Sequence, residues 1–497
     1  MSDAEQQQQA AAAGAESLEF SEFESLLTKE FKPKTDDQTQ AVTSAVKTLA
    51  AQVMSEVATI PEDAEDAVQA IIAAIDEKLS SQLNKILHNK EFQKLEGTWR
   101  GLAHLVNNTE SGTQLKIRVY NVSKKEVTKT LKKFKGAKWD QSPLFKKIYE
   151  EEFGSPGGEP YGALIGDFEF GHGPQDVQAL ESIAQIAAAA HAPFFAAADP
   201  KLMNMDSWQE LSNPRDIAGI FNTAEHASWR SLRESADSQY IGLTMPRFLS
   251  RIPYGPDTEP VEEFNFVEET EGADHNAYTW SNAAYAMGVN INASFKEYGW
   301  TTAIRGVEGG GMVEGLPVHT FPTEDGGVDM KCPTEIAITD RREAELSAQG
   351  LMPLCHWKNT DYSVFIGGQS LQKPQEYDDP DATSNANLAS RLPYTFATCR
   401  FAHYLKCIVR DKLGSFASRN DMQDFLNTWI KQFVLLDDNA SQGAKARKPL
   451  AAADVVVEEV EGNPGYYSSK FYLKPHYQLE GLSVSLRLVT KLPSEKG

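Results

Sequence analysis

Hydrophobic residues recur at helical spacing after the first 40 residues. One stripe contains Val42, Val46, Leu49, Val53 and Val57, and a second, after Pro61, contains Val68, Ile72, Ile75, Leu79, Leu83 and Ile86. A third runs through Phe92, Leu95, Trp99 and Leu102. Positions three and four apart share one face of a helix, so the pattern predicts three amphipathic helices. Each has a single apolar face, so we expect these helices to pair with one another or with a helix of a partner.

A shorter helix is predicted before them. Residues 1–16 are rich in Gln and Ala and are expected to be disordered. Next, Phe20, Phe23, Leu26, Leu27 and Phe31 follow helical spacing up to Pro33, which ends the pattern. Two interpretations stay open. The helix packs on the core of its own chain, or it is a ligand for a groove in another protein.

From Thr113 onward the pattern is mixed α/β. Strands are predicted at Leu115–Val122, Ala163–Phe170 and Pro193–Ala198, with helices at Ser123–Lys135 and Pro174–Ala192 between them. A strand, helix and strand in this order predict parallel pairing. A loop-rich middle follows, and further helices are expected at Trp280–Met287, Tyr394–Leu413 and Asp421–Leu436. The fold class is therefore α/β in the broad sense: a mixed α+β chain with a helical N-terminal region.

The chain ends in strands that lack partner surface. Val455–Val460 and the aromatic-rich Tyr466–Leu473 are strand candidates. Leu482, Val484, Leu486 and Leu488 then alternate with polar residues, which predicts a strand with one buried face. A terminal pair of strands is marginal alone, and its edge amides invite pairing with another chain. We expect a neighbouring protein to complete this sheet.

Composition narrows the function classes. The net charge is -22, which argues against nonspecific binding to nucleic acid or anionic membranes. The most apolar segment, Ile183–Ala198, is too short and too polar to cross a membrane. No signal-peptide pattern is present, and the four cysteines are widely spaced. We expect a cytoplasmic protein with reduced thiols.

Two glycine-rich segments do not fit nucleotide binding. Gly171–Asp176 lies between a strand and a helix, but Asp176 stands where a dinucleotide fingerprint needs glycine. An acidic residue there would repel a pyrophosphate, so a plain turn is expected. Arg305–Met312 lacks the Lys-Ser/Thr of a phosphate-binding loop. It is expected to be a mobile loop or a site of close backbone packing.

Two clusters could carry chemistry. Asp167 and Glu169 share one strand face, with His172 nearby, which would suit acid–base catalysis, a metal or ion pairs to arginine. Cys399, His403 and Cys407 lie on one helix face, but the outer two are about 12 Å apart along the axis. Two ligands of one zinc ion lie no more than about 4.6 Å apart. Buried core side chains are the expected role.

Two charge runs have opposite sign. Lys124–Lys147 contains nine lysines, and Asp257–Asp274 contains no basic residue. The basic run could bind nucleic acid, form a solvated face or meet an acidic protein surface. Opposite patches on one chain suit self-association.

Several segments together resemble the large subunit of the type VI secretion contractile sheath, the TssC/VipB family. They are Glu96–Leu102 (EGTWRGL), Leu144–Gly154 (LFKKIYEEEFG), Gly158–Phe170 (GEPYGALIGDFEF), Ser250–Gly255 (SRIPYG), Trp280–Gly288 (WSNAAYAMG) and Cys399–Cys407 (CRFAHYLKC). The resemblance runs from about Asp36 to Pro493. Phage tail sheath proteins are similar more loosely, at the C-terminal end.

The resemblance implies a structural protein without catalytic residues, cofactor or metal. Family members pair with a small sheath subunit and polymerise from a baseplate around an inner tube of hexamers, and contraction drives that tube forward. The alternative is a cytoplasmic α/β enzyme using the paired carboxylates. The domains implied are a disordered tail with a short helix (1–35), a helical region for the small subunit (36–110), an α/β core (111–450) and inter-subunit strands (451–497).

The resemblance also implies roles for residues. The inter-subunit strands would use Tyr467, Phe471, Leu473, Leu482, Val484, Leu486 and Leu488. The small-subunit interface would use Val46, Leu49, Val53, Ile72, Ile75 and Leu79. Phe20, Phe23, Leu26 and Leu27 match, in position and amphipathicity, a helix that a hexameric recycling ATPase grips in some members. No nucleic acid and no direct membrane insertion are implied.

Overall fold

The computed structural model describes residues 40, 44 and 64–476, except 214, 263, 271, 273, 324, 413–418, 438 and 460–466. The chain divides into two compact units. Unit 1 comprises residues 1–89 and 253–269, and unit 2 comprises residues 90–252 and 270–497.

Unit 1 contains the long helix α3 (Ala64–Leu87) and the segment 253–269. Asn84 on α3 is buried and joins the two. Its Nδ2 donates to the backbone oxygen of Val267 at 3.2 Å, and its Oδ1 accepts from the backbone N–H of Glu269 at 3.0 Å. The buried Glu268 carboxylate accepts from the backbone N–H of Tyr254 at 2.9 Å. Buried polar groups are thereby paired, as a small core requires.

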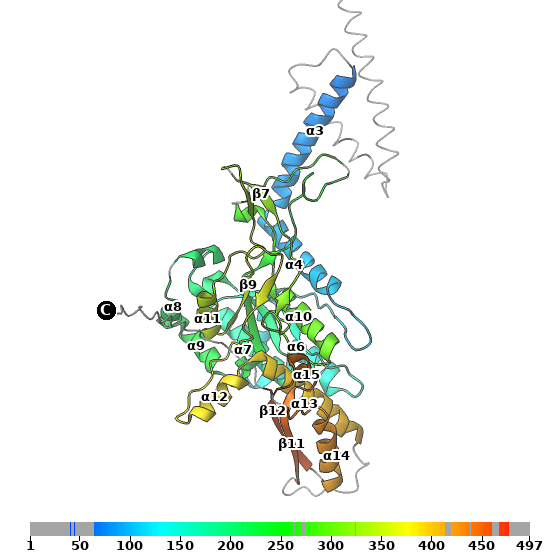
Figure 1. The fold of residues 1–497 in the computed structure, drawn as a ribbon, viewed down its shortest axis with the longest axis vertical. Coiled ribbons are helices and arrows are strands. Elements are labelled where there is room, and N and C mark those ends of the chain that lie inside the picture. The colour runs from blue at the N-terminus through cyan, green and yellow to red at the C-terminus, as the bar shows by residue number, and fades with distance from the viewer. Residues whose placement is uncertain are drawn as a thin grey trace, which may run out of the picture. The chain divides into compact units, whose positions relative to one another are not determined.

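Unit 2 is built on a sheet of six strands within its described residues, in the order β1-β2-β3-β9-β10-β6 (Figure 1). The strands are β1 (Leu164–Phe170), β2 (Phe194–Ala198), β3 (Ile241–Met245), β9 (Leu351–His356), β10 (Ser363–Phe365) and β6 (Met312–Val313). β1, β2, β3 and β9 run parallel, and β10 pairs antiparallel with β9 and β6. Short antiparallel pairs join β4 (Phe248–Leu249) to β5 (Trp280–Ser281) and β7 (Thr320–Pro322) to β8 (Val328–Met330).

Unit 2 also contains twelve α-helices among its described residues. Their bounds are α4 (Lys90–Asn107), α5 (Lys124–Lys133), α6 (Pro143–Phe145), α7 (Pro174–Ala190), α8 (Ile217–Phe221), α9 (Ala227–Glu234), α10 (Ala283–Tyr298), α11 (Asp340–Ala348), α12 (Pro380–Ala389), α13 (Leu392–Lys412), α14 (Arg419–Lys431) and α15 (Gln442–Arg447). Capping side chains and a proline determine where several of these helices begin. Ser123 and Glu126 form a reciprocal capping box at the start of α5. Pro174 occupies the first turn of α7, and Asn282 caps α10.

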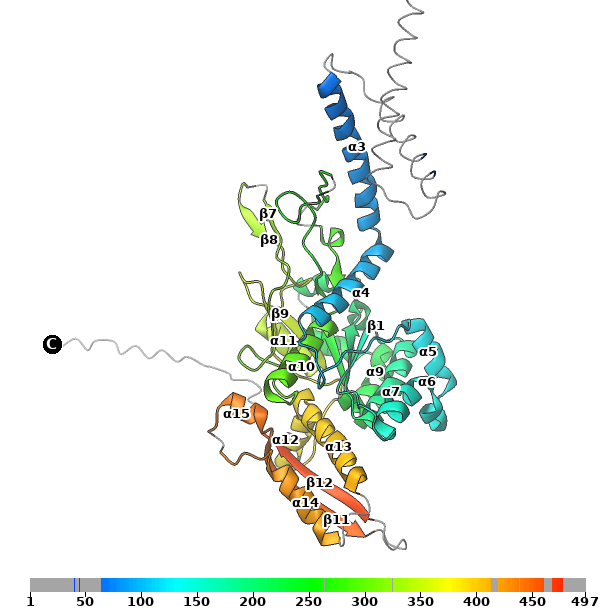
Figure 2. The same ribbon diagram turned by 90° about the vertical axis from the view of Figure 1, so that its right-hand side faces the viewer.

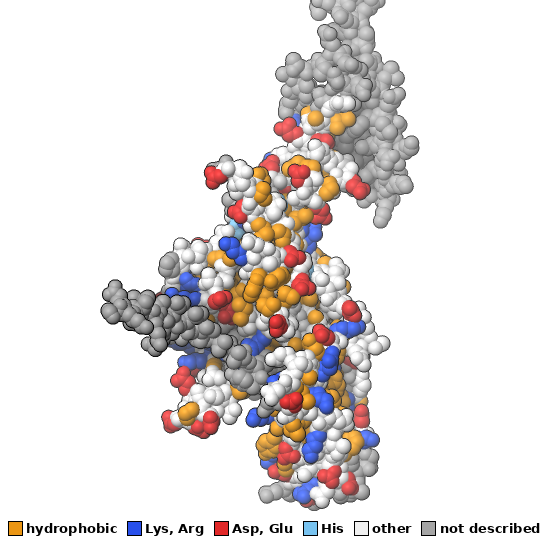
Figure 3. Space-filling model, viewed as in Figure 1, with side chains coloured by type: hydrophobic (Ala, Val, Ile, Leu, Met, Phe, Trp, Pro, Cys, Tyr) orange, Lys and Arg blue, Asp and Glu red, His pale blue; other side chains and the backbone are white. Residues whose placement is uncertain are grey.

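The C-terminal part of unit 2 is a helix–hairpin layer. β11 (Leu450–Glu459) pairs antiparallel with β12 (Tyr467–Pro475), and α14 lies along β11 (Figure 2). A cluster of buried side chains holds this layer together; it contains Trp300, Phe401, Leu405, Leu426, Ile430, Leu450, Val455 and Val457. On the face drawn in Figure 3, charges of both signs are interspersed over this region.

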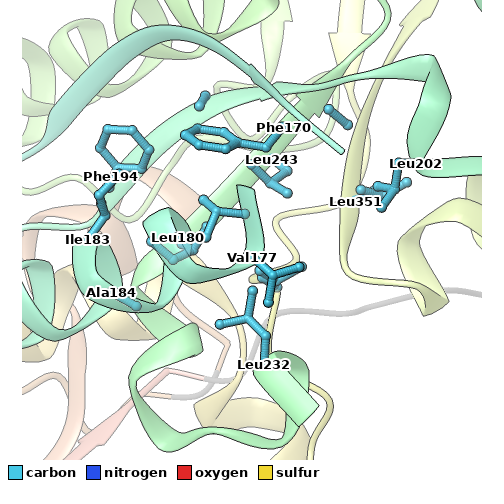
Figure 4. Close-up of a cluster of buried hydrophobic side chains, with 14 of the residues drawn as sticks. Phe170, Val177, Leu180, Ile183, Ala184, Phe194, Leu202, Leu232, Leu243 and Leu351 are labelled. Atoms are coloured by element: carbon cyan, nitrogen blue, oxygen red, sulfur yellow. The ribbon is translucent and has the colours of Figure 1, made fainter. Parts of the chain in front are cut away.

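The main core of unit 2 has three layers. Successive residues of β2 point to opposite faces: Phe194 enters the cluster beneath α7, and Phe195 enters the cluster beneath α10. Figure 4 shows α7 side chains facing the strands, with Leu180 and Ile183 near Phe170 and Phe194. A largely parallel sheet with helices on both faces explains why β2, in the sequence FFAAA, is apolar and buried along its whole length.

The predicted strand–helix–strand unit is confirmed: β1, α7 and β2 form it, and β1 pairs parallel with β2. The predicted strand at Leu115–Val122 is wrong, because that segment has no strand pairing in the described chain. Lys116 and Arg118 instead form ion pairs with Glu159 and Glu152. The helix predicted from Trp280 begins at Ala283, because Trp280 and Ser281 form β5.

Candidate assembly interface

The β11–β12 hairpin offers an open strand edge. In an antiparallel pair, alternate residues turn their N–H and C=O groups away from the partner strand. The backbone groups of Val455 and Val457 point away from β12, since they bond to side chains of α14. Val455 lies opposite Phe471, and Val457 lies opposite Ser469. By the same alternation, β12 directs its outer groups at Tyr467, Ser469, Phe471 and Leu473. Within the described residues, these outer groups have no hydrogen-bond partner.

The two faces of β12 differ. Phe471 and Leu473 are half-buried against the cluster of the helix–hairpin layer. On the other face, Tyr472 is 59% exposed, and Lys470 pairs with Glu458 across the hairpin at 2.7 Å. An added strand would therefore continue an apolar row on one side and a polar row on the other. Leu482, Val484, Leu486 and Leu488 lie outside the described residues.

Helix α4 carries two opposite faces. One packs closely on its own unit through glycines: a Cβ at Gly97 would lie 2.3 Å from the backbone oxygen of Trp280, and one at Gly101 would lie 2.5 Å from the Tyr285 ring. The Ser281 hydroxyl also donates to the backbone oxygen of Gly97 at 2.8 Å. Glycine at these positions lets α4 approach β5 and α10.

The other face of α4 is apolar and exposed. Its side chains are Phe92, Leu95, Trp99, Leu102 and Val106, of which Leu102 is half-buried because it also packs on the cluster that contains Leu105 and Phe195. Four of them are 37%, 55%, 63% and 47% exposed in the order Phe92, Leu95, Trp99 and Val106. The spacing of three, four, three and four residues is the heptad pattern of a helix–helix seam. Such a contiguous stripe marks an interaction surface.

Helix α3 shows the same property within unit 1. Ile72 and Ile86 are 52% and 42% exposed, Leu79 is 38% exposed, and Ile75 is half-buried. Three residues of the stripe predicted from the sequence are thus exposed. Val46, Leu49 and Val53 lie outside the described residues, as do Phe20, Phe23, Leu26 and Leu27.

Of the two predicted carboxylates, Glu169 has a charged partner. Glu169 lies 3.9 Å from Arg247, which also pairs with Glu335 at 2.7 Å. His172 bonds to the backbone oxygen of Lys201 at 2.9 Å and stacks on His226. Among the described residues, no three His, Cys, Asp or Glu side chains are placed to share a metal ion.

The remaining candidates are also structural. Cys399 and His403 are buried, and His403 Nε2 bonds to the backbone oxygen of Ala190 at 2.8 Å. At Gly171–Asp176, the Asp176 carboxylate accepts from the Gly171 N–H at 2.8 Å and pairs with Lys124 at 2.7 Å. In the segment 305–312, a Cβ at Gly310 would lie 2.2 Å from the Ala303 backbone oxygen, so the glycines permit close packing.

Sequence reasoning missed parts of both surfaces. It did not include Val106 in the third stripe, although the seven-residue step from Trp99 identifies it. Within the predicted strand Tyr466–Leu473 it named Tyr467, Phe471 and Leu473 as inter-subunit residues but not Ser469, whose outward amide follows only from the register with Val457. No described helix combines the length and apolarity needed to cross a membrane.

Comparison with known proteins decides the family. Residues 69–372 match the family described as EvpB/VC_A0108, tail sheath N-terminal domain, and residues 381–492 match EvpB/VC_A0108, tail sheath gpW/gp25-like domain. The chain belongs to the VipB tail sheath family. The predicted resemblance is therefore confirmed, and the family is structural, not enzymatic. The hairpin β11–β12 lies in the gpW/gp25-like region, and α4 lies in the N-terminal sheath region.

One curated relative agrees with this family, and two solved structures are distantly similar. The type VI secretion system sheath protein TssC1 of Pseudomonas aeruginosa is 66% identical over 477 residues, which is 96% of each chain. A chain in the cryo-EM structure of the anti-feeding prophage baseplate has a TM-score of 0.35 at 10% identity, over 63% of this chain and 66% of that chain. A chain of the contracted anti-feeding prophage sheath has a TM-score of 0.31 at 11% identity, over 62% and 66%.

Proposed function

We propose that the chain is the large subunit of a type VI secretion contractile sheath. It forms a heterodimer with the small sheath subunit in the cytoplasm. The heterodimers polymerise from a baseplate around an inner tube of hexamers, and contraction propels that tube. No cofactor, nucleic acid or membrane insertion takes part. The extended lattice is a metastable state that exchanges one set of subunit contacts for a more stable set.

The open edge of β12 carries this proposal. Within the described residues, four successive outward-directed positions, from Tyr467 to Leu473, offer unpaired backbone groups beside an apolar row. Strand addition uses both features: main-chain hydrogen bonds supply affinity, and alternate side chains supply specificity. The strand predicted at Leu482–Leu488 has the matching alternation, and it would come from a neighbouring copy. Links of this kind connect subunits while their other surfaces move.

The exposed helix stripes support the heterodimer. Ile72, Ile75 and Leu79 on α3 and Phe92 to Val106 on α4 present apolar side chains that a partner helix would cover. The small sheath subunit is the proposed partner, with Val46, Leu49 and Val53 on the preceding predicted helix. Phe20, Phe23, Leu26 and Leu27 are the proposed contacts of a recycling ATPase.

Deletion of residues 481–497 tests strand addition. The truncated chain is co-expressed with the small subunit encoded beside it and examined by negative-stain electron microscopy. We expect a soluble heterodimer that forms no tubules, because the donated strand is missing. Deletion of residues 491–497 is the control; it keeps Leu482–Leu488 and should leave tubules intact.

Two outcomes would contradict the proposal. Tubules of normal length from the 481–497 deletion would show that the strand is not a lattice link. A discrete monomer from the full chain with its small subunit would argue against a sheath subunit altogether.

A further inference from the structure

The outer edge of β11 is occupied by side chains of α14. Asn427 Nδ2 donates to the backbone oxygen of Val455 at 2.9 Å, and Asn427 Oδ1 accepts from the backbone N–H of the same residue at 3.0 Å. Gln423 Oε1 accepts from the N–H of Val457 at 3.0 Å. A carboxamide offers the same donor and acceptor as a peptide group. Asn427 therefore satisfies both the backbone N–H and the C=O of Val455, as a neighbouring strand would.

The beginning of β11 is closed by main chain. The N–H of Leu435 donates to the backbone oxygen of Leu450 at 2.9 Å, and the N–H of Leu450 donates to the backbone oxygen of Phe433 at 3.3 Å. Along this edge, within the described residues, outward groups remain open only at Ala453, Val457 C=O and Glu459. No two successive outward-directed residues are fully open.

The contrast with β12 is direct. Within the described residues, β12 has four successive open positions, whereas β11 is interrupted at two successive outward positions, Val455 and Val457. An incoming strand forms a ladder only where consecutive outward groups are free, because each unmatched group that loses water without gaining a hydrogen bond is costly. Among the described residues, the hairpin thus has one edge with a continuous row of open backbone groups and one edge without such a row.

We propose that Asn427 and Gln423 determine which edge of the hairpin accepts a strand from a neighbouring copy of this chain. They block β11, so addition takes place at β12 alone, and the link between copies has one direction. This rests on the proposed strand exchange, but the block itself is a property of the unassembled chain. The incoming strand places its apolar residues beside Phe471 and Leu473, where they extend the apolar cluster.

Asn427 and Gln423 are well placed to cover the edge of β11. α14 also covers Val455 and Val457 side chains, which are almost completely buried. Helix packing alone needs apolar residues such as Leu426 and Ile430, which are also buried. The two carboxamides add nothing to that apolar contact and act on the backbone edge. Covering an edge is one way in which proteins avoid unwanted strand pairing.

Hydrogen exchange with residue resolution tests the block in the full chain, before and after assembly with the small subunit. In the unassembled chain, we expect slow exchange at Val455 and Val457 and fast exchange at Ser469, Phe471 and Leu473. On assembly, only the β12 amides should become slow. Fast exchange at Val455 in the unassembled chain, or new protection at Val455 on assembly, would overturn the proposal.

Variants at Asn427 separate the block from folding. Asn427→Ala should speed exchange of the Val455 amide about tenfold, the effect of losing one hydrogen bond, and should produce irregular aggregates in place of tubules. Asn427→Asp keeps the acceptor for that N–H and should keep its protection. Thr428→Ala, at an exposed position on the same helix, is the control.

The outcomes distinguish the two proposals. Unchanged Val455 exchange in a folded Asn427→Ala chain would overturn the block. Protection of Val455 as expected, with no new protection on β12 during assembly, would instead contradict strand exchange.

Discussion

Arg247 and Glu335 form an ion pair whose carboxylate is almost completely buried. Arg247 Nη2 and Glu335 Oε1 are 2.7 Å apart, and the backbone N–H of Arg247 donates to Glu335 Oε2 at 2.9 Å. His275 Nε2 lies 3.1 Å from the same Oε1. Burial alone would raise the pKa of Glu335, but Arg247 and His275 lower it to about 2. The Glu335 carboxylate therefore holds together three segments of the chain, those around Arg247, His275 and Glu335 itself.

Replacing Glu335 with Gln should destabilise the folded chain. Gln keeps the shape but loses the charge, so the charged hydrogen bonds with Arg247 are lost, and we expect the free energy of unfolding to fall by about 1.5–3 kcal/mol. Denaturant unfolding measures this. The control is Glu345→Gln, whose carboxylate pairs at the surface with Arg341 and Arg342 and should cost less than about 1 kcal/mol. Equal effects of the two changes would contradict the argument.

The buried His403 predicts a pH dependence. Burial lowers the pKa of His403 to about 4, whereas an unfolded chain has the ordinary value of about 6.5. Between these values the unfolded state binds a proton that the folded state does not, so stability falls as pH falls.

The measurement compares the wild-type chain with His403→Gln, which keeps a donor for the Ala190 oxygen but does not titrate. Between pH 7 and 5, the wild type should lose up to about 2 kcal/mol more unfolding free energy than the variant. Parallel pH profiles would argue against this assignment.

Gly97→Ala should disturb the seating of α4. The added methyl group would lie 2.3 Å from the Trp280 backbone oxygen, which cannot rotate away. We expect a loss of about 1–3 kcal/mol in unfolding free energy, because the helix must shift. Gly112→Ala is the matched control, since no atom lies within 4 Å of the place that its added methyl group would take. Similar melting temperatures for both variants would contradict close packing at Gly97.

Trp99→Glu should weaken binding of the small subunit and spare the fold. Trp99 is 63% exposed, so folding gains little from it, while a buried Trp in an interface commonly contributes about 2 kcal/mol or more. Co-purification with the small subunit should drop, with the melting temperature of the large chain unchanged. Asn107→Glu adds the same charge on the flank of α4 and serves as the control. Undiminished co-purification would show that this face of α4 does not bind the small subunit.

Periodicity predicted the helices and the parallel unit well. The stripes of α3 and α4, the apolar β2 and the aromatic-rich β12 are local patterns that the sequence shows directly. The strand predicted at Leu115–Val122 was wrong because a hydrophobic pattern shows only strand propensity, whereas a strand also needs a partner strand beside it. There, ion pairs from Lys116 and Arg118 hold the segment instead.

The candidate interface was predictable only in part. The unfinished terminal sheet followed from strand edges, but the sequence paired Tyr466–Leu473 with the terminal strand and did not show β11 as its direct neighbour. Asn427 and Gln423 were invisible, because a polar residue on a helix gives no sign that it bonds to a strand 28 and 34 residues away. Such contacts depend on the tertiary register of α14 and β11.

The single open edge of the hairpin has a consequence for mixtures of subunits. On the proposed strand exchange, a chain that lacks residues 481–497 would still accept a strand at β12 but would donate none. It would therefore join a growing lattice and leave the next position without a link. Small amounts of this truncated chain, added to the intact one, should shorten the polymers far more than their share of the total would suggest.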